Sequence, residues 1–168
     1  MKRCWLIRLG LLSASLFFFS LANAAEMGAV GGDMPPPDGK HLWKYITETN
    51  PYKGWGYWPT HYGMYPGKAP HGAYLVLYAN SLALKAAREG KPMPYGAILV
   101  KENYDSDKET LLSITPMYKV KGYNPEQGDL FWAKYEPDGK IDKEGKPAGC
   151  INCHEAAKDT GWIFAPTK

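Results

Sequence analysis

The chain has 168 residues, with 20 Lys or Arg, 17 Asp or Glu and a formal net charge of +3 at pH 7. Three of the positive charges, Lys2, Arg3 and Arg8, lie within residues 1–24, so the rest of the chain carries 17 basic and 17 acidic residues. A neutral chain with interspersed charges gives no electrostatic basis for binding nucleic acid or an anionic membrane, so neither partner is expected.

Residues 1–24 have the composition of a secretory signal peptide. A basic start is followed by an apolar run from about Leu9 to Leu21 and then by Ala22-Asn23-Ala24, an A-x-A cleavage site. The apolar run is shorter than the roughly 20 residues that a membrane-spanning helix needs. We therefore expect export to the periplasm, cleavage after residue 24 and a mature protein with no membrane span.

Residues 25–37 are rich in Gly and Pro and predict a flexible leader, after which residues 38–168 predict one domain. The domain begins with a predicted helix that starts at Asp38, its cap, and stops at Asn50-Pro51. Residues 52–72 are crowded with aromatic side chains and broken by Gly and Pro. We expect this stretch to be an ordered loop packed by its own rings.

The central part of the chain predicts strands. Residues 73–79 are almost continuously apolar and predict a buried strand, and Asn80 can cap a following helix that ends at Gly90. Three further strands are predicted over residues 95–104, 110–122 and 128–136. Their short connections favour an antiparallel sheet, so the predicted fold class is mainly β with a few helices. Pro116 should then lie in an edge strand or at a bulge.

Cys150, Cys153 and His154 form a C-x-x-C-H motif near the end of the chain. Two thiols at this spacing can add to the two vinyl groups of a haem, while the next residue presents its imidazole to the iron. The motif therefore predicts one covalently attached haem c per chain. Cys150 and Cys153 are the predicted attachment points, and His154 is the predicted iron ligand.

Other uses of two nearby thiols fit the sequence less well. A thioredoxin-like redox site needs a strand before the motif and a helix after it, near the start of a βαβ unit, whereas this motif follows a run of predicted strands. A structural zinc site needs two further Cys or His ligands at a workable spacing, and the sequence offers no second pair. A plain disulfide or a metal half-site stays open as an alternative.

Together with this motif, the chain from about Trp58 to Phe164 resembles the cytochrome P460 and cytochrome c′-β family. The resemblance rests on the order and spacing of several segments: Pro70-His71-Gly72 before YLVLYAN, PMPYGAILVKE, MYKVKGYNPEQGDLFWAKYEPDG, GCINCHEAA and a late WIF. It implies a mainly antiparallel β fold of the α+β type, often dimeric, with one c-type haem and a proximal histidine. An ordinary class I cytochrome c is instead helical and carries its C-x-x-C-H near the N-terminus.

The resemblance implies two activities, which residues on the distal side of the haem distinguish. P460 enzymes oxidise hydroxylamine and carry a lysine cross-linked to the haem edge, whereas c′-β proteins lack this bond and bind nitric oxide behind an apolar cap. The family's lysine precedes a segment that is Met93-Pro94-Tyr95-Gly96 here. Lys85 is the nearest candidate for the family's lysine, although Lys91 lies closer in sequence to this segment. For both residues, the alternative is an ordinary solvated lysine. Met93 stands at the usual aromatic cap position.

Further distal candidates lie in the predicted strands and the aromatic loop. Lys101 and Glu102 alternate along one strand, so only one of them can face the haem. We expect Glu102 to do so as a proton acceptor, with an ordinary surface charge as the alternative. His61 is a candidate for the distal pocket, and His71 is either a distal group or a hydrogen-bonded structural histidine. Met117 is a core residue, a distal contact or a sixth iron ligand.

The sequence thus predicts a periplasmic c-type haem protein that oxidises hydroxylamine or a related small nitrogen compound and passes electrons to a soluble redox partner. Two alternatives remain open. One is a nitric oxide binding protein with an apolar cap, and the other is a simple electron carrier whose iron has both axial positions filled. The resemblance also implies a homodimer.

Overall fold

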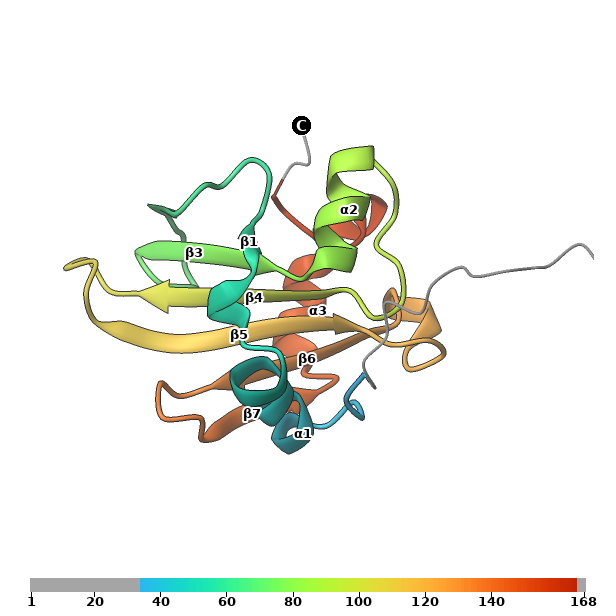
Figure 1. Cartoon of the computed structure of the whole chain (residues 1–168), viewed down its shortest axis with the longest axis horizontal. Helices are drawn as coiled ribbons and strands as arrows, with labels where there is room; N and C mark the ends of the chain where they lie inside the picture. Colours follow the sequence, from blue (N-terminus) through green and yellow to red (C-terminus); the bar gives the residue numbers. More distant parts are fainter. Residues whose placement is uncertain (1–33, 166–168) are drawn as a thin grey trace, which may run out of the picture. The chain divides into compact units, whose positions relative to one another are not determined.

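The computed structural model describes residues 34–165, so the predicted signal peptide and most of the predicted leader lie outside the described range. A single antiparallel sheet of seven strands dominates the described fold (Figure 1). The strands are β1 (Gly56–Tyr57), β2 (Met64–Pro66), β3 (Tyr74–Ala79), β4 (Ile98–Tyr104), β5 (Leu111–Lys119), β6 (Leu130–Tyr135) and β7 (Ile141–Gly145). Their order is β1-β3-β4-β5-β6-β7, and β2 also pairs with β3. The predicted mainly β fold class is confirmed.

Three α-helices accompany the sheet, and two have the predicted caps. The helices are α1 (Gly39–Lys44), which continues into a π-helical segment (Tyr45–Thr49), α2 (Ser81–Glu89) and α3 (Ala148–His154), which continues into a 3-10 segment (Glu155–Thr160). The Asp38 carboxylate accepts a 2.9 Å hydrogen bond from the His41 amide at the start of α1. Asn80 caps α2 by accepting from the Ala83 amide at 3.0 Å, and Gly90 ends α2 in a left-handed conformation with φ 65°. Over the described residues, no helix is long and apolar enough to cross a membrane.

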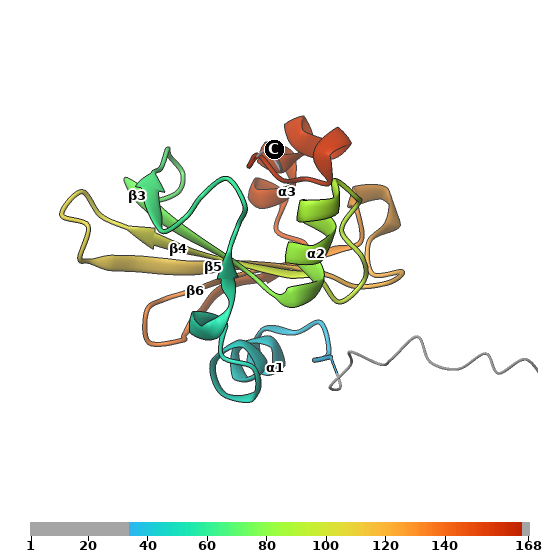
Figure 2. The same ribbon diagram turned by 45° about the horizontal axis from the view of Figure 1, so that its top comes forward.

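The sheet separates two hydrophobic cores because alternate residues of each strand point to opposite faces. The first core joins Leu77, Leu99 and Trp132 of the strands to α2 and α3. The second core joins Val76, Ile98, Val100 and Phe131 to Leu42 of α1 and Ile46 just after it. Figure 2 shows α2 and α3 on one side of the sheet and α1 on the other. Both faces of the central strands are therefore buried, which explains their almost continuous apolar sequence.

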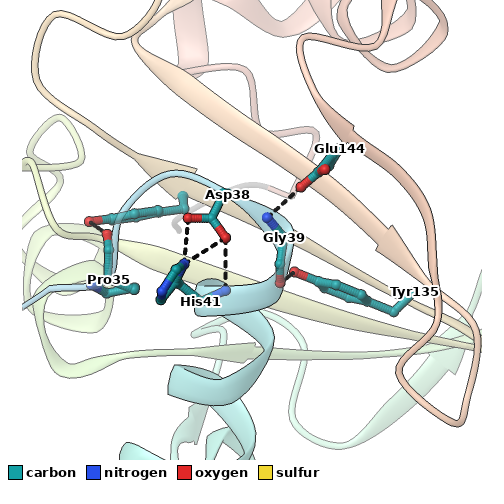
Figure 3. Close-up of polar contacts among 7 residues, drawn as sticks. Pro35, Asp38, Gly39, His41, Tyr135 and Glu144 are labelled. Carbon is teal, nitrogen blue, oxygen red and sulfur yellow. Dashed lines mark hydrogen bonds and ion pairs between the residues drawn. The ribbon is translucent and has the colours of Figure 1, made fainter.

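Polar contacts fix α1 and the residues before it to the second-core side (Figure 3). The Gly39 amide donates to the Glu144 carboxylate of β7, and the Gly39 carbonyl accepts a 2.8 Å hydrogen bond from the Tyr135 hydroxyl. The Tyr118 hydroxyl donates to the buried Pro35 carbonyl at 3.1 Å. The described part of the predicted leader, residues 34–37, is therefore attached to the fold.

Pro116 does not lie in an edge strand, because β5 is flanked by β4 and β6. The β5–β6 register pairs Ile114 with Tyr135 and then Met117 with Trp132, so the pairing skips Thr115 and Pro116. Proline has no amide hydrogen to donate to a neighbouring strand, so the β5–β6 pairing is interrupted here. The gap lies beside the cavity described next.

Candidate functional site

A cavity of about 490 Å³ lies on the first-core side of the sheet. Its volume is in the range of roughly 300–1,000 Å³ that is common for small-molecule and cofactor sites. One wall comes from β3 to β6 and another from α3 and the residues that lead into it. Its lining includes His71, Leu77, Leu99, Lys101, Met117, Trp132, Lys134, Lys143, Cys150, Cys153 and His154.

Helix α3 brings Cys150, Cys153 and His154 to the cavity together. Residues three and four apart in an α-helix lie on the same side, which places both cysteines and the adjacent histidine along one wall. Both thiols are free; Cys150 is partly buried and Cys153 is exposed. Burial raises the pKa of the Cys150 thiol. The two cysteines form no disulfide with each other in this structure.

His154 is buried and held in one orientation. Its Nδ1 lies 2.7 Å from the Trp162 carbonyl oxygen, and because a carbonyl can only accept, Nδ1 carries the proton and donates. This tautomer leaves the lone pair on Nε2. The rings of Trp132 and Phe164 pack against the imidazole at centroid distances of 4.7 and 5.1 Å. Burial lowers the pKa of His154, which favours the neutral form that binds metals. A backbone acceptor at Nδ1 is typical of metal-ligating histidines.

His71, a predicted distal candidate, lines the same cavity. Its Nδ1 lies 2.9 Å from Oδ1 of Asn103. The Asn103 side-chain nitrogen donates to the Ser113 carbonyl at 3.0 Å and to the Thr115 hydroxyl at 3.1 Å, which fixes the orientation of the amide. Nδ1 of His71 is therefore the donor in its bond to Asn103. Burial lowers the pKa of His71 to about 4.

Glu102, which the sequence predicts to face the site, is not part of the cavity lining, whereas Lys101 is. Lys101 lines the cavity, where burial lowers its pKa to about 8. Glu102 is fully buried on the opposite face. There it accepts hydrogen bonds from the hydroxyls of Tyr52 at 2.6 Å and Tyr104 at 3.0 Å, and it forms an ion pair with Lys53.

The remaining distal candidates are divided between the cavity and other parts of the fold. Met117 is buried and lines the cavity. Met93 is buried in the first core but lines a separate pocket beside the segment that follows α3. His61 packs on Tyr65 at a centroid distance of 4.0 Å, outside the cavity lining. Lys85 is exposed on α2 and is likewise outside the lining.

Lys91, the second candidate lysine, is also exposed. Its ammonium pairs with the Glu89 carboxylate at 2.8 Å. It is not among the residues that line the cavity. Of Lys85, Lys91 and Lys101, the structure brings Lys101 to the cavity.

The cytochrome P460 family model matches residues 49–165, which is more than two thirds of the chain. The chain belongs to the cytochrome P460 family. The match spans the whole sheet, α2, α3 and the C-x-x-C-H motif, and it begins after α1. A comparison with curated proteins finds no match. Membership of the cytochrome P460 family implies a haem cytochrome.

The cavity residues fit such a haem. The indole nitrogen of Trp132 is buried and has no hydrogen-bond partner within the part of the chain that the structure describes. An unpaired buried N–H group costs about 1–3 kcal/mol, which favours a ligand that supplies an acceptor. Leu77, Leu99 and Met117 offer apolar surface to a porphyrin, and the ammonium of Lys143 can balance a propionate. The ammonium of Lys134 is paired with the Asp142 carboxylate at 2.8 Å.

Proposed function

We propose that this protein is a periplasmic c-type haem protein that oxidises hydroxylamine or a related small nitrogen compound. The supporting observation is that Cys150, Cys153 and His154 share one cavity with the partly buried amine of Lys101. In this proposal the two thiols hold the haem by thioether bonds, and Nε2 of His154 binds the iron. The haem, when bound, supplies the redox centre that accepts electrons from the substrate. A soluble redox partner and a homodimeric state belong to the same proposal.

Lys101 is the group we propose to handle protons. Each electron that hydroxylamine loses is matched by a proton lost from an N–H or O–H bond. Because the pKa of Lys101 is about 8, part of its amine is unprotonated near neutral pH and can accept that proton. The lysine cross-link implied by the resemblance is the alternative role for Lys101, since Lys85 is exposed outside the cavity lining; a cross-linked nitrogen would not act as this free amine.

The apolar wall of the cavity supports a second candidate function. Leu77, Leu99 and Met117 present hydrocarbon and thioether surface rather than hydrogen-bonding groups. A small uncharged ligand such as nitric oxide needs no polar partner, so a nitric oxide binding protein is the alternative that this wall favours.

The test is hydroxylamine turnover by the purified haem-loaded protein, with a soluble cytochrome or a redox dye as electron acceptor. We expect turnover in the wild type and a drop of about 100-fold or more in Lys101→Met, the range typical of a lost general base. Lys85→Met carries the same chemical change at an exposed position, and we expect it to keep the wild-type rate.

Two results would overturn the proposal. If the haem is covalently bound but hydroxylamine is not oxidised, while the reduced protein binds nitric oxide, the binding function is correct instead. Equal losses in Lys101→Met and Lys85→Met would remove Lys101 from the reaction. In addition, a red-shifted Soret band of the reduced wild type that disappears in Lys101→Met would identify the cross-linked lysine.

A further inference from the structure

Two imidazoles lie near each other in the lining of the cavity. His71 precedes β3, and His154 ends α3. The ring centroids lie 6.4 Å apart, and the ring planes are inclined by 88°. This separation is longer than the contacts of 4.7 and 5.1 Å that the His154 ring makes with Trp132 and Phe164. His71 and His154 are therefore not packed as tightly as neighbouring core rings.

The separation matches two imidazoles on opposite sides of one metal ion. A metal lies about 2 Å from a coordinating imidazole nitrogen, and that nitrogen lies about 1 Å from the centre of its ring. Two such ligands in line thus place their ring centroids roughly 6 Å apart. The 6.4 Å between His71 and His154 agrees with this value.

The hydrogen bonds of both rings leave Nε2 as the atom that can coordinate a metal. Nδ1 of His154 donates to the Trp162 carbonyl, and Nδ1 of His71 donates to the Asn103 side chain. Each neutral ring therefore keeps its lone pair on Nε2. Outer hydrogen bonds of this kind orient histidines that bind metals.

The fold holds His71 close to Asn103. A Cβ added to Gly72 would lie 2.3 Å from the Tyr104 carbonyl oxygen and 2.6 Å from the Tyr104 amide nitrogen. Only glycine allows the chain to pass β4 at this distance. The residue after His71 thus secures the backbone approach that brings the imidazole to the cavity.

We propose that His71 is the second axial ligand of the haem iron, opposite His154. This inference rests on the haem site of the proposed function and deepens it. The resting iron would be six-coordinate, and hydroxylamine or nitric oxide would have to displace His71 to reach it. Access to the metal would then depend on how easily the Nε2 atom of His71 is released, rather than on an open distal position.

The test is the spin state of the ferric haem-loaded protein, measured by electron paramagnetic resonance and by its optical spectrum. We expect a low-spin signal of bis-imidazole type in the wild type and a high-spin signal in His71→Ala. Added imidazole should restore the low-spin signal in that variant. The control is His41→Ala, since His41 lies on α1 across the sheet from the cavity.

A second readout covers the case in which His71→Ala folds poorly. If His71 occupies the sixth position, cyanide must compete with it for the ferric iron, and its apparent affinity is reduced accordingly. Cyanide should then bind the folded fraction of His71→Gln at least about tenfold more tightly than the wild type. Equal affinities would contradict ligation by His71.

The outcomes separate this inference from the proposed function. A high-spin wild type that oxidises hydroxylamine overturns the His71 proposal and leaves the function in place. A low-spin wild type that becomes high-spin in His71→Ala, but never oxidises hydroxylamine, supports the ligand and overturns the function. A low-spin signal that persists in His71→Ala assigns the sixth position to another group, such as Met117, and overturns the inference.

Discussion

The two faces of the sheet are built by the same strands and differ in how they treat polar groups. On the second-core face, the buried carboxylate of Glu102 is surrounded by partners: the hydroxyls of Tyr52 and Tyr104 and the ammonium of Lys53. On the first-core face, Lys101 and the indole of Trp132 border a cavity of about 490 Å³. One face is closed by its own side chains, and the other keeps space for a ligand.

Neighbouring residues of β4 express this difference most clearly. Lys101 and Glu102 are adjacent in sequence, yet they point to opposite sides of the sheet. The Glu102 carboxylate stabilises the fold, because it is bound by the hydroxyls of two tyrosines and by the ammonium of Lys53. The amine lies beside Cys153 and His154, where burial lowers its pKa. Stability and chemistry are thus assigned to different faces of one strand.

The largest effect is expected on the closed face. Glu102→Ala removes the acceptor of two tyrosine hydroxyls and the partner of Lys53. We expect the free energy of unfolding to fall by about 3 kcal/mol, because buried donors are left without acceptors. Urea unfolding measures the loss, and Glu109→Ala, at an exposed loop position, should change it by less than about 0.5 kcal/mol.

The haem spectrum provides a second measurement on the Glu102→Ala variant. Glu102 lies across the sheet from the cavity, so folded Glu102→Ala protein should keep the wild-type spectrum. A spectrum altered as strongly as that of Lys101→Met would show that the two faces are not separate in function.

The next largest effect is expected at Lys101 on the cavity face, where the free energy of unfolding should depend on pH. The pKa of Lys101 falls from 10.5 to about 8 on folding. Between these values the unfolded chain binds more protons than the folded one, so this group makes the free energy of unfolding increase as the pH rises from about 8 to 10.5. Below about pH 8 the penalty for burying the charged amine is fully present.

Replacing Lys101 by Met should therefore stabilise the protein at pH 7 by about 1–3 kcal/mol, and this gain should shrink as the pH approaches 10.5. Urea unfolding at several pH values measures it. Lys85→Met should show no such pH-dependent difference from the wild type. A gain in Lys101→Met that stays constant from pH 7 to 10.5 would contradict a depressed lysine pKa in the cavity.

The smallest effect is expected at the start of α1. Asp38→Ala removes the side chain that accepts from the His41 amide at 2.9 Å. Loss of an N-cap costs about 1 kcal/mol, and Asp38→Asn, which can still accept this bond, should cost much less. Thermal or urea unfolding of the two variants decides the point. Equal losses in both would mean that the charge of Asp38, rather than its capping bond, stabilises α1.

The sequence was sufficient to locate the central strands, the caps of α1 and α2 and the C-x-x-C-H motif, because each depends on local spacing. It did not reveal β7, whose residues are mostly exposed and polar. It also could not choose between Lys101 and Glu102, since apolar residues precede both on their own faces: Leu99 on one side and Val100 on the other. The approach of His71 to His154 depends on tertiary packing between distant segments.

The central claim is that the open face of the sheet holds a haem bound covalently through Cys150 and Cys153. The most direct test is the intact mass of the purified, exported protein under denaturing conditions, compared with Cys150→Ala/Cys153→Ala. We expect the wild type to retain the added mass of one haem after denaturation and the double variant not to. A wild-type mass equal to that of the polypeptide with two free thiols, from cells able to mature c-type cytochromes, would contradict it.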